Sequence, residues 1–156
     1  MLTSVIVNNN NLKNFLIPGV IVLLFTAWIG TRYMTIATFN YLLILAGFLV
    51  RNKDRRIHVR LVSLGILFDL CLVLILEFER SAIATAMSFK LSLLNQVHIY
   101  SSSLATALYI PQAITGYRLR NGEGPRKAHR ILGFMVILFR TIGFLLMFSM
   151  IESKNV

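Results

Sequence analysis

The sequence predicts an all-α integral membrane protein built as a bundle of five transmembrane helices. Hydrophobic residues make up 56% of the 156 positions and the mean hydropathy is +0.72, whereas a soluble domain is about 45–50% apolar. The excess stands in long blocks, each near the ~20 residues that an α-helix needs to cross ~30 Å of hydrocarbon. Lipid offers no partner for free backbone groups, so these blocks must be helices. We expect a single transmembrane domain over residues 1–156.

The elements follow in order along the chain. A polar tail over 1–11 leads into the first span. We expect this span to be retained, because the basic segment and the cleavage site of a signal peptide are both missing around it. Only the short stretch GTRY separates the first two apolar blocks, so a four-span arrangement stays open. Between the third and fourth blocks, apolar residues at helical spacing over 81–94 predict a short interfacial helix. The expected spans are 12–30, 33–50, 57–78, 94–117 and 131–151.

The net charge of +10 comes from a biased distribution of basic residues. Ten of the sixteen Lys and Arg residues lie in two short stretches, 51–60 and 118–130, each next to an apolar block. The positive-inside rule places both stretches in the cytoplasm, and with five spans the N-terminus lies there too. Orientation in the membrane and contact with anionic lipid explain this charge, and we expect no nucleic-acid partner.

Two stretches of the chain resemble each other. RRIHVRLVSLGILFDL (55–70) aligns with RKAHRILGFMVILFRT (126–141) at an offset of 71 residues, which sets His58 on His129. Upstream, AGFLVRN (46–52) aligns with TGYRLRN (115–121) at an offset of 69. The sequence therefore predicts two helical hairpins that repeat in parallel about an axis along the membrane normal, with one extra N-terminal span.

The same alignment sets Asp69 on Arg140, each 11 residues beyond its histidine. At ~1.5 Å per residue both side chains lie ~16 Å inside the basic boundary, near the middle of the bilayer. A lone charge there costs at least about 2.5–3.5 kcal/mol. We expect an intramembrane ion pair that joins the two hairpins. The alternative is that either residue faces a cofactor, a proton path or a partner subunit.

His58 and His129 lie at matched depth just inside the basic boundary. Two imidazoles on neighbouring helices could ligate a metal or the iron of a b-type haem. The alternative is that both rings simply sit among lipid headgroups. Four nearby arginines are expected to contact haem propionates or lipid: Arg56, Arg60, Arg126 and Arg130.

His98 begins the fourth span and so lies at the outer side, where a second metal or quinone-type site is conceivable near Glu77 and Glu79. An ordinary interfacial histidine is the competing interpretation. No Gly-rich phosphate loop, metal-protease motif or Ser-His-Asp set is present. We therefore expect a protein that is not an enzyme.

The stretch 97–147 resembles a small family of bacterial and archaeal membrane proteins that includes the YozB- and CtaM-like proteins. The resembling features are His98 near the start of a span, GYRLRNGEGPRKAHRILG leading into His129, and TIG at 141–143. RNKDRRIHVRLV, with His58, resembles the basic entry to another span. The resemblance implies a helical protein of the bacterial or archaeal cytoplasmic membrane, linked with the biogenesis of haem-copper oxidases and handling haem or metal through its histidines.

Three hypotheses about function follow. The first is a non-catalytic accessory or assembly subunit of a membrane redox complex, in contact with other integral subunits and with lipid, which could hold haem b. The second is a b-type haem protein that transfers electrons. The third is a purely structural membrane subunit without a cofactor.

Overall fold

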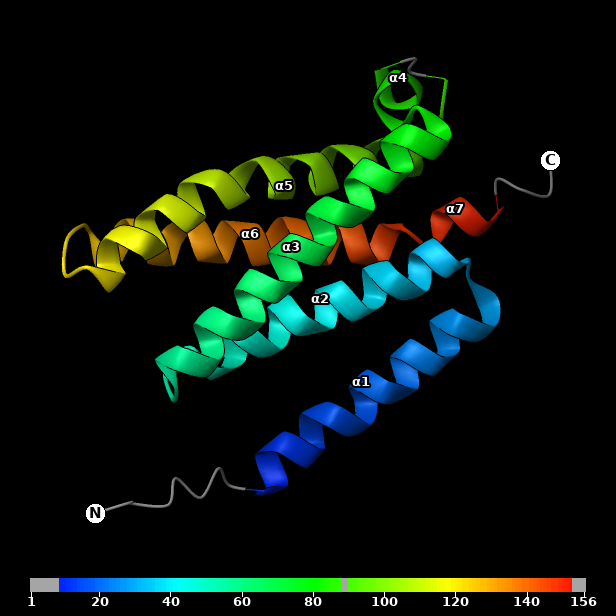
Figure 1. Ribbon diagram of the computed structural model, residues 1–156. Helices are drawn as coiled ribbons and strands as arrows, with labels where there is room; N and C mark the ends of the chain where they lie inside the picture. The colour runs from blue at the N-terminus through cyan, green and yellow to red at the C-terminus, as the bar shows by residue number, and fades with distance from the viewer. Residues whose placement is uncertain (1–8, 88–89, 153–156) are drawn as a thin grey trace.

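A computed structural model of the chain describes residues 9–87 and 90–152, and all its regular elements in these ranges are helices (Figure 1). The predicted polar tail lies mostly outside the described residues, and the first helix already begins inside its range, at Asn9. The helices are α1 (Asn9–Ile29), α2 (Arg32–Val50), α3 (Arg55–Arg80), α4 (Ala82–Met87), α5 (Leu93–Arg120), α6 (Arg126–Leu146) and α7 (Ser149–Glu152).

Each of the five predicted spans falls on a helix. Thr31 separates the first two, because its Oγ1 accepts a hydrogen bond from Met34 N and caps the start of α2. The predicted interfacial helix is shorter than expected and ends as α4 at Met87, and residues 88–89 lie outside the described part. The fifth predicted span, 131–151, is divided between two helices. α6 begins earlier than predicted, at Arg126, and ends at Leu146, and the short helix α7 follows it.

The bundle is built from two helical hairpins that run in the same direction. α2 packs on α3, and α5 packs on α6. Figure 1 shows the loops of both hairpins, 51–54 and 121–125, at the same end of the molecule. The start of α1 lies at that end too, while α4 and α7 lie at the opposite end. The parallel arrangement agrees with the orientation that the internal repeat predicts.

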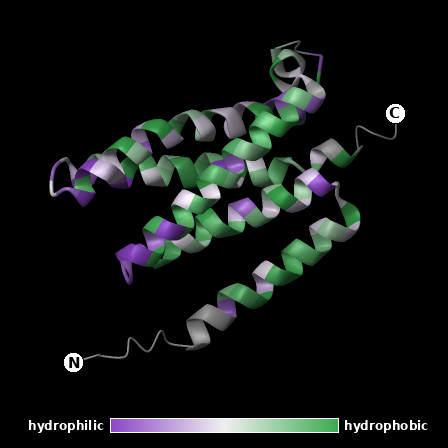
Figure 2. Cartoon of the chain, in the orientation of Figure 1, coloured by the Kyte–Doolittle hydropathy of each residue, from purple (hydrophilic) through white to green (hydrophobic). Residues whose placement is uncertain are grey.

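The hairpins join through contacts of α2 with α6 and of α3 with α5. The apolar core lies at this junction, and Figure 2 shows the hydrophobic residues along the helices and the hydrophilic ones at the loops. α1 packs on α2 and leaves Trp28 85% exposed, as suits a helix that faces lipid. The core residues are Tyr41, Ile44, Tyr109, Val136 and Ile137.

Within the described residues, three helices are long and apolar enough to cross a membrane: Arg32–Val50, Arg55–Glu79 and Arg126–Leu146. α1 contributes a shorter apolar stretch, Asn14–Ile29. α5 has 28 residues, enough length to cross, but its polar residues lower its hydropathy. This finding is thus coarser than the prediction of five spans.

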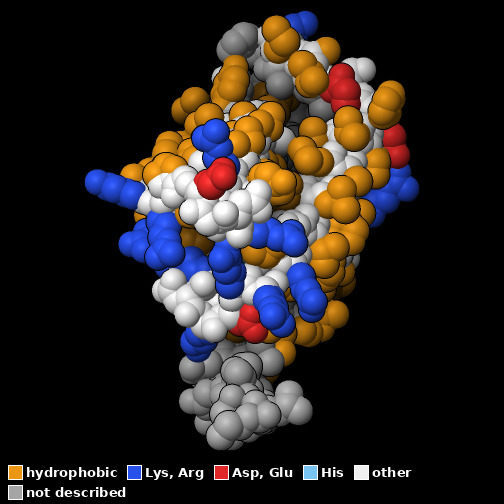
Figure 3. Space-filling model, turned by 60° about the vertical axis from the view of Figure 1, so that its left-hand side comes forward, with side chains coloured by type: hydrophobic (Ala, Val, Ile, Leu, Met, Phe, Trp, Pro, Cys, Tyr) orange, Lys and Arg blue, Asp and Glu red, His pale blue; other side chains and the backbone are white. Residues whose placement is uncertain are grey.

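The two basic loops gather at one end of the bundle. Figure 3 views this end and shows Lys and Arg side chains around both hairpin loops. In the first loop, Asp54 is used locally, because its Oδ1 accepts hydrogen bonds from the backbone of Arg56 and Ile57 and caps α3. In the second, Gly122 and Gly124 have φ of +82° and +103°, which a glycine adopts without strain.

Candidate functional site

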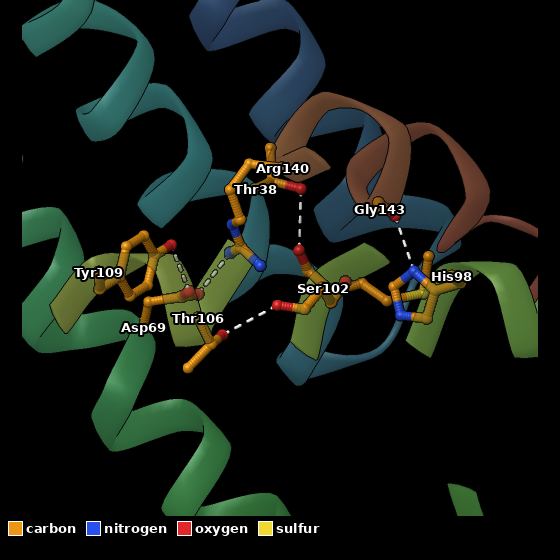
Figure 4. Close-up of polar contacts among 9 residues, drawn as sticks. Thr38, Asp69, His98, Ser102, Thr106, Tyr109, Arg140 and Gly143 are labelled. Atoms are coloured by element: carbon orange, nitrogen blue, oxygen red, sulfur yellow. Dashed lines mark hydrogen bonds and ion pairs between the residues drawn. The ribbon is translucent and has the colours of Figure 1, made fainter. Parts of the chain in front are cut away.

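A buried carboxylate lies where three helices meet in the middle of the bundle. Asp69 of α3 is only 1% exposed. Its Oδ1 forms an ion pair with Nη2 of Arg140 from α6, and its Oδ2 accepts a hydrogen bond of 2.8 Å from the hydroxyl of Tyr109 on α5 (Figure 4). The structure therefore brings together the two charges that the sequence pairs, and links one hairpin to the other through them.

Both carboxylate oxygens of Asp69 thus have a partner. A buried ion pair stabilises only where further hydrogen bonds satisfy the remaining polar atoms, because the cost of removing two charges from water is large. Tyr109 supplies that further bond and is itself buried, at 2% exposure. Sequence reasoning missed Tyr109. The available signal was a tyrosine inside an apolar run, since a buried hydroxyl needs a partner.

The buried face of α5 is polar along most of its length. Four of its five buried residues, Asn95, Ser101, Tyr109 and Gln112, carry polar side chains, and the fifth is Ala105. From Ser101 onward, the buried residues are spaced by three or four (101, 105, 109 and 112), which puts them on one face of α5, and α5 packs on α6. The low hydropathy of α5 therefore reflects an inward polar face. We call the polar seam the set Asn95, His98, Ser101, Ser102, Tyr109, Gln112 and Thr115 on α5, with Asp69, His129 and Arg140.

His129 closes the seam at the basic end. Its Nδ1 lies 3.1 Å from Oγ1 of Thr115, and its Nε2 lies 3.4 Å from Nε2 of Gln112. Thr115 Oγ1 also donates to backbone carbonyls of its own helix. Because carbonyls only accept, the Thr115 hydroxyl hydrogen points to them. The Thr115 oxygen can then only accept from His129, so Nδ1 of His129 carries the hydrogen and donates to it. Nε2 of His129 then accepts from the Gln112 amide, and both ring nitrogens are engaged.

His58 occupies the corresponding place in the first hairpin. Its Nδ1 lies 2.7 Å from the carbonyl oxygen of Gly47 on α2. Since a carbonyl only accepts, Nδ1 carries the hydrogen and donates. Gly116, which the repeat aligns with Gly47, lies next to His129 without bonding it: a Cβ at Gly116 would be 3.2 Å from Cε1 of the His129 ring.

His98 lies at the other end of the seam. Its Nδ1 donates to the carbonyl oxygen of Gly143 on α6 over 2.7 Å, and Figure 4 shows this contact beside Ser102. The glutamates expected beside it have other partners. Glu79 pairs with Arg32 over 3.4 Å, and Glu77 accepts from the backbone of Ile83 over 2.8 Å. His98 therefore fastens α5 to α6.

The residues do not fit a haem held by His58 and His129 as they stand. Nε2 of His129 is taken by the Gln112 amide, so it would have to break that contact to bind iron. Within residues 9–87 and 90–152 no three His, Cys, Asp or Glu side chains group as metal ligands. The four arginines expected near the propionates are exposed at the basic end: Arg56, Arg60, Arg126 and Arg130.

A small cavity adjoins the ion pair where α2, α5 and α6 meet. Its volume is about 20 Å³, and one water molecule needs roughly 10–15 Å³ measured in this way. Polar side chains line it on several sides, from Tyr41, His98, Ser102 and Arg140. Ala37 closes it from α2.

Several buried polar atoms of the bundle lack a hydrogen-bond partner among the described residues. They are Nε of Arg140, Oε1 of Gln112, and both side-chain atoms of Asn40, which is fully buried. Buried polar atoms are nearly always paired in proteins, with protein groups or with ordered water. Each of these atoms has capacity for one more hydrogen bond than the described protein groups supply.

Comparisons with protein-family models, with curated proteins and with solved structures find no significant match for this chain. The resemblance to the YozB- and CtaM-like proteins accordingly stays a prediction from the short motifs that carry it. The site must be interpreted from its own geometry.

Proposed function

We propose that the protein is a non-catalytic accessory subunit of a membrane redox complex, and that its histidines hold its own helices together. One observation carries this proposal: the ionisable side chains inside the bundle bind other groups of the same chain. Asp69 is bound by Arg140 and Tyr109, and His98 and His129 each bind a neighbouring helix or their own hairpin. The link to a redox complex rests on the resemblance to proteins of haem-copper oxidase biogenesis.

We further propose five spans in a bacterial or archaeal cytoplasmic membrane, with both basic loops in the cytoplasm. The inward polar face of α5 supports a crossing helix, because its outer face then meets lipid with residues such as Leu104, Ile110 and Ile114, all exposed. The concentration of Lys and Arg around the two loops supports the orientation.

The decisive experiment is purification in mild detergent followed by an absorption spectrum and elemental analysis. Copurification of haem-copper oxidase subunits with a colourless, metal-free chain supports the accessory function. A chain that purifies alone from membranes that contain an assembled oxidase contradicts it.

A b-type haem protein is the second candidate, and one observation favours it. The carbonyl of Gly47 holds Nδ1 of His58, which leaves its Nε2 as a lone pair without a partner among the described residues, the usual state of a ligating histidine. A Soret band that is lost in His58→Ala would support this candidate. A colourless protein after expression with haem supplied contradicts it.

A further inference from the structure

We propose that the polar seam is hydrated and relays protons between the two ends of the bundle. This goes beyond the accessory function, and it rests on the proposed crossing of the membrane by α5. The starting observation is the placement of the ionisable groups. His129 lies near the basic end, Asp69 and Tyr109 in the middle, and His98 near the opposite end.

The seam has the two properties that a relay needs. Chains of Asp and His side chains inside membrane bundles mark proton paths, because a buried ionisable group is otherwise too costly to keep. Water must fill the gaps between them. Arg140 Nε and Gln112 Oε1 are buried atoms without a partner in the described part of the chain. They lie on either side of Tyr109 along the seam, and both are satisfied if water enters.

The cavity beside Arg140 supplies the outer part of the path. It is large enough for one water molecule, and that water would touch Arg140 and Ser102 and meet His98. The hydrogen of His98 lies on Nδ1, bound to Gly143, so its Nε2 can accept a proton from water. The inner part runs from His129 to Asp69 through water bound at Oε1 of Gln112, while the Gln112 amide nitrogen only holds the His129 ring in place.

Asp69 is the group in the seam that takes up the proton. When a proton joins its carboxylate, the ion pair with Arg140 loosens. Arg140, which lines the cavity, then lets water from the cavity reach the carboxyl and take the proton. Every transfer breaks one N–H or O–H bond and forms another, so the net result is one positive charge moved across the membrane. The groups that face Asp69 and set its state are Arg140 from α6 and Tyr109 from α5.

The experiment uses the full chain reconstituted into vesicles of phosphatidylcholine and phosphatidylglycerol. Valinomycin and a potassium gradient supply the driving potential and the counter-charge, and a trapped dye reports internal pH. The expected result is acidification faster than in empty vesicles, falling to the empty-vesicle rate in Asp69→Asn and in Ala37→Leu. Ala37 lines the cavity, so a leucine there displaces its water.

Ala107→Leu is the matched control, because it makes the same change of side chain at an exposed position of α5. It is expected to conduct like the unaltered chain. An unaltered chain that acidifies no faster than empty vesicles overturns the relay, and so does an Ala37→Leu variant that conducts normally. If Asp69→Asn does not fold, the pair Ala37→Leu and Ala107→Leu still decides, since each variant's thermal unfolding is measured alongside.

Discussion

Asp69 joins three helices through its two carboxylate oxygens, so we expect the stability of the bundle to depend on single polar atoms at this site. The carboxylate meets a guanidinium from α6 and a phenol from α5, which are the two helices of the second hairpin. Removing one partner of a buried pair leaves a charge without compensation, which costs more than the pair itself contributes. Substitutions that keep the shape of the side chain separate the loss of charge from the loss of packing.

Asp69→Asn should destabilise the protein by about 3–5 kcal/mol, because Arg140 is then a buried charge without its counter-charge. Arg140→Gln should cost a similar amount for the reverse reason. The double variant should be more stable than the sum of the two predicts, and a double-mutant cycle of unfolding in detergent measures the difference. Additive effects would mean that the two charges do not stabilise each other. Glu79→Gln, which breaks the exposed pair with Arg32, is the control and should change stability little.

Tyr109→Phe removes only the hydroxyl that donates to Asp69. A hydrogen bond to a charged group contributes about 1.5–3 kcal/mol, so we expect a loss of that size. Tyr117→Phe is the matched control, because the Tyr117 side chain is 66% exposed on the same helix. Thermal unfolding of both variants checks the prediction. Equal midpoints for the two variants would show that the Tyr109 hydroxyl contributes nothing to the bundle.

At the level of helices, periodicity and charge predicted more than hydropathy did. The repeat offset of 71 residues placed Asp69 opposite Arg140, and the structure pairs them. The polar face of α5 was not predicted because its residues are mostly small and neutral. Single Ser, Thr and Gln residues in an apolar run do not indicate whether they face the protein interior or the lipid. Knowing that α6 covers this face required the tertiary packing.

The hydrogen bonds of the histidines also escaped prediction. Sequence spacing could place His58 and His129 at matched depth, but not identify the backbone carbonyl of Gly47 or the amide of Gln112 as their partners. Such contacts depend on how closely two helices approach, and the approach is set by glycines. A Cβ at Gly47 would lie 2.6 Å from Cγ2 of Val62 and 3.1 Å from its backbone nitrogen.

Gly47→Ala should therefore push α2 and α3 apart and destabilise the first hairpin, by about 1–3 kcal/mol as for other overpacked sites. Gly19→Ala is the matched control on α1. Its Cβ would make ordinary contacts of 3.7 and 3.8 Å with Leu42, and replacing a helical glycine by alanine gains about 0.5–1 kcal/mol. The two substitutions should thus shift the unfolding midpoint in opposite directions. A shift of the same sign in both would mean that the helices do not depend on close approach at Gly47.

At the scale of the whole molecule, the path of α5 decides how the chain crosses the membrane. The structure places the loop between α5 and α6 at the end opposite to α4 (Figure 1). If α5 crosses, Glu123 and Lys53 share one side of the membrane and Ala84 lies on the other. If only the three most apolar helices cross, Glu123 and Ala84 must share a side, because α5 alone connects them.

Cysteine labelling separates these topologies. In a Cys71→Ser background, a single cysteine is placed at Lys53, Ala84 or Glu123, all exposed positions. We expect a membrane-impermeant maleimide added outside intact cells to label only the cysteine at position 84, with positions 53 and 123 labelled after the cells are opened. Labelling of position 123 together with 84 would show that α5 does not cross, and a seam that never spans the membrane could not carry protons through it. Conversely, labelling of 84 alone means that the buried polar face of α5 runs through the bilayer, where lipid cannot satisfy it and only α6 and internal water can.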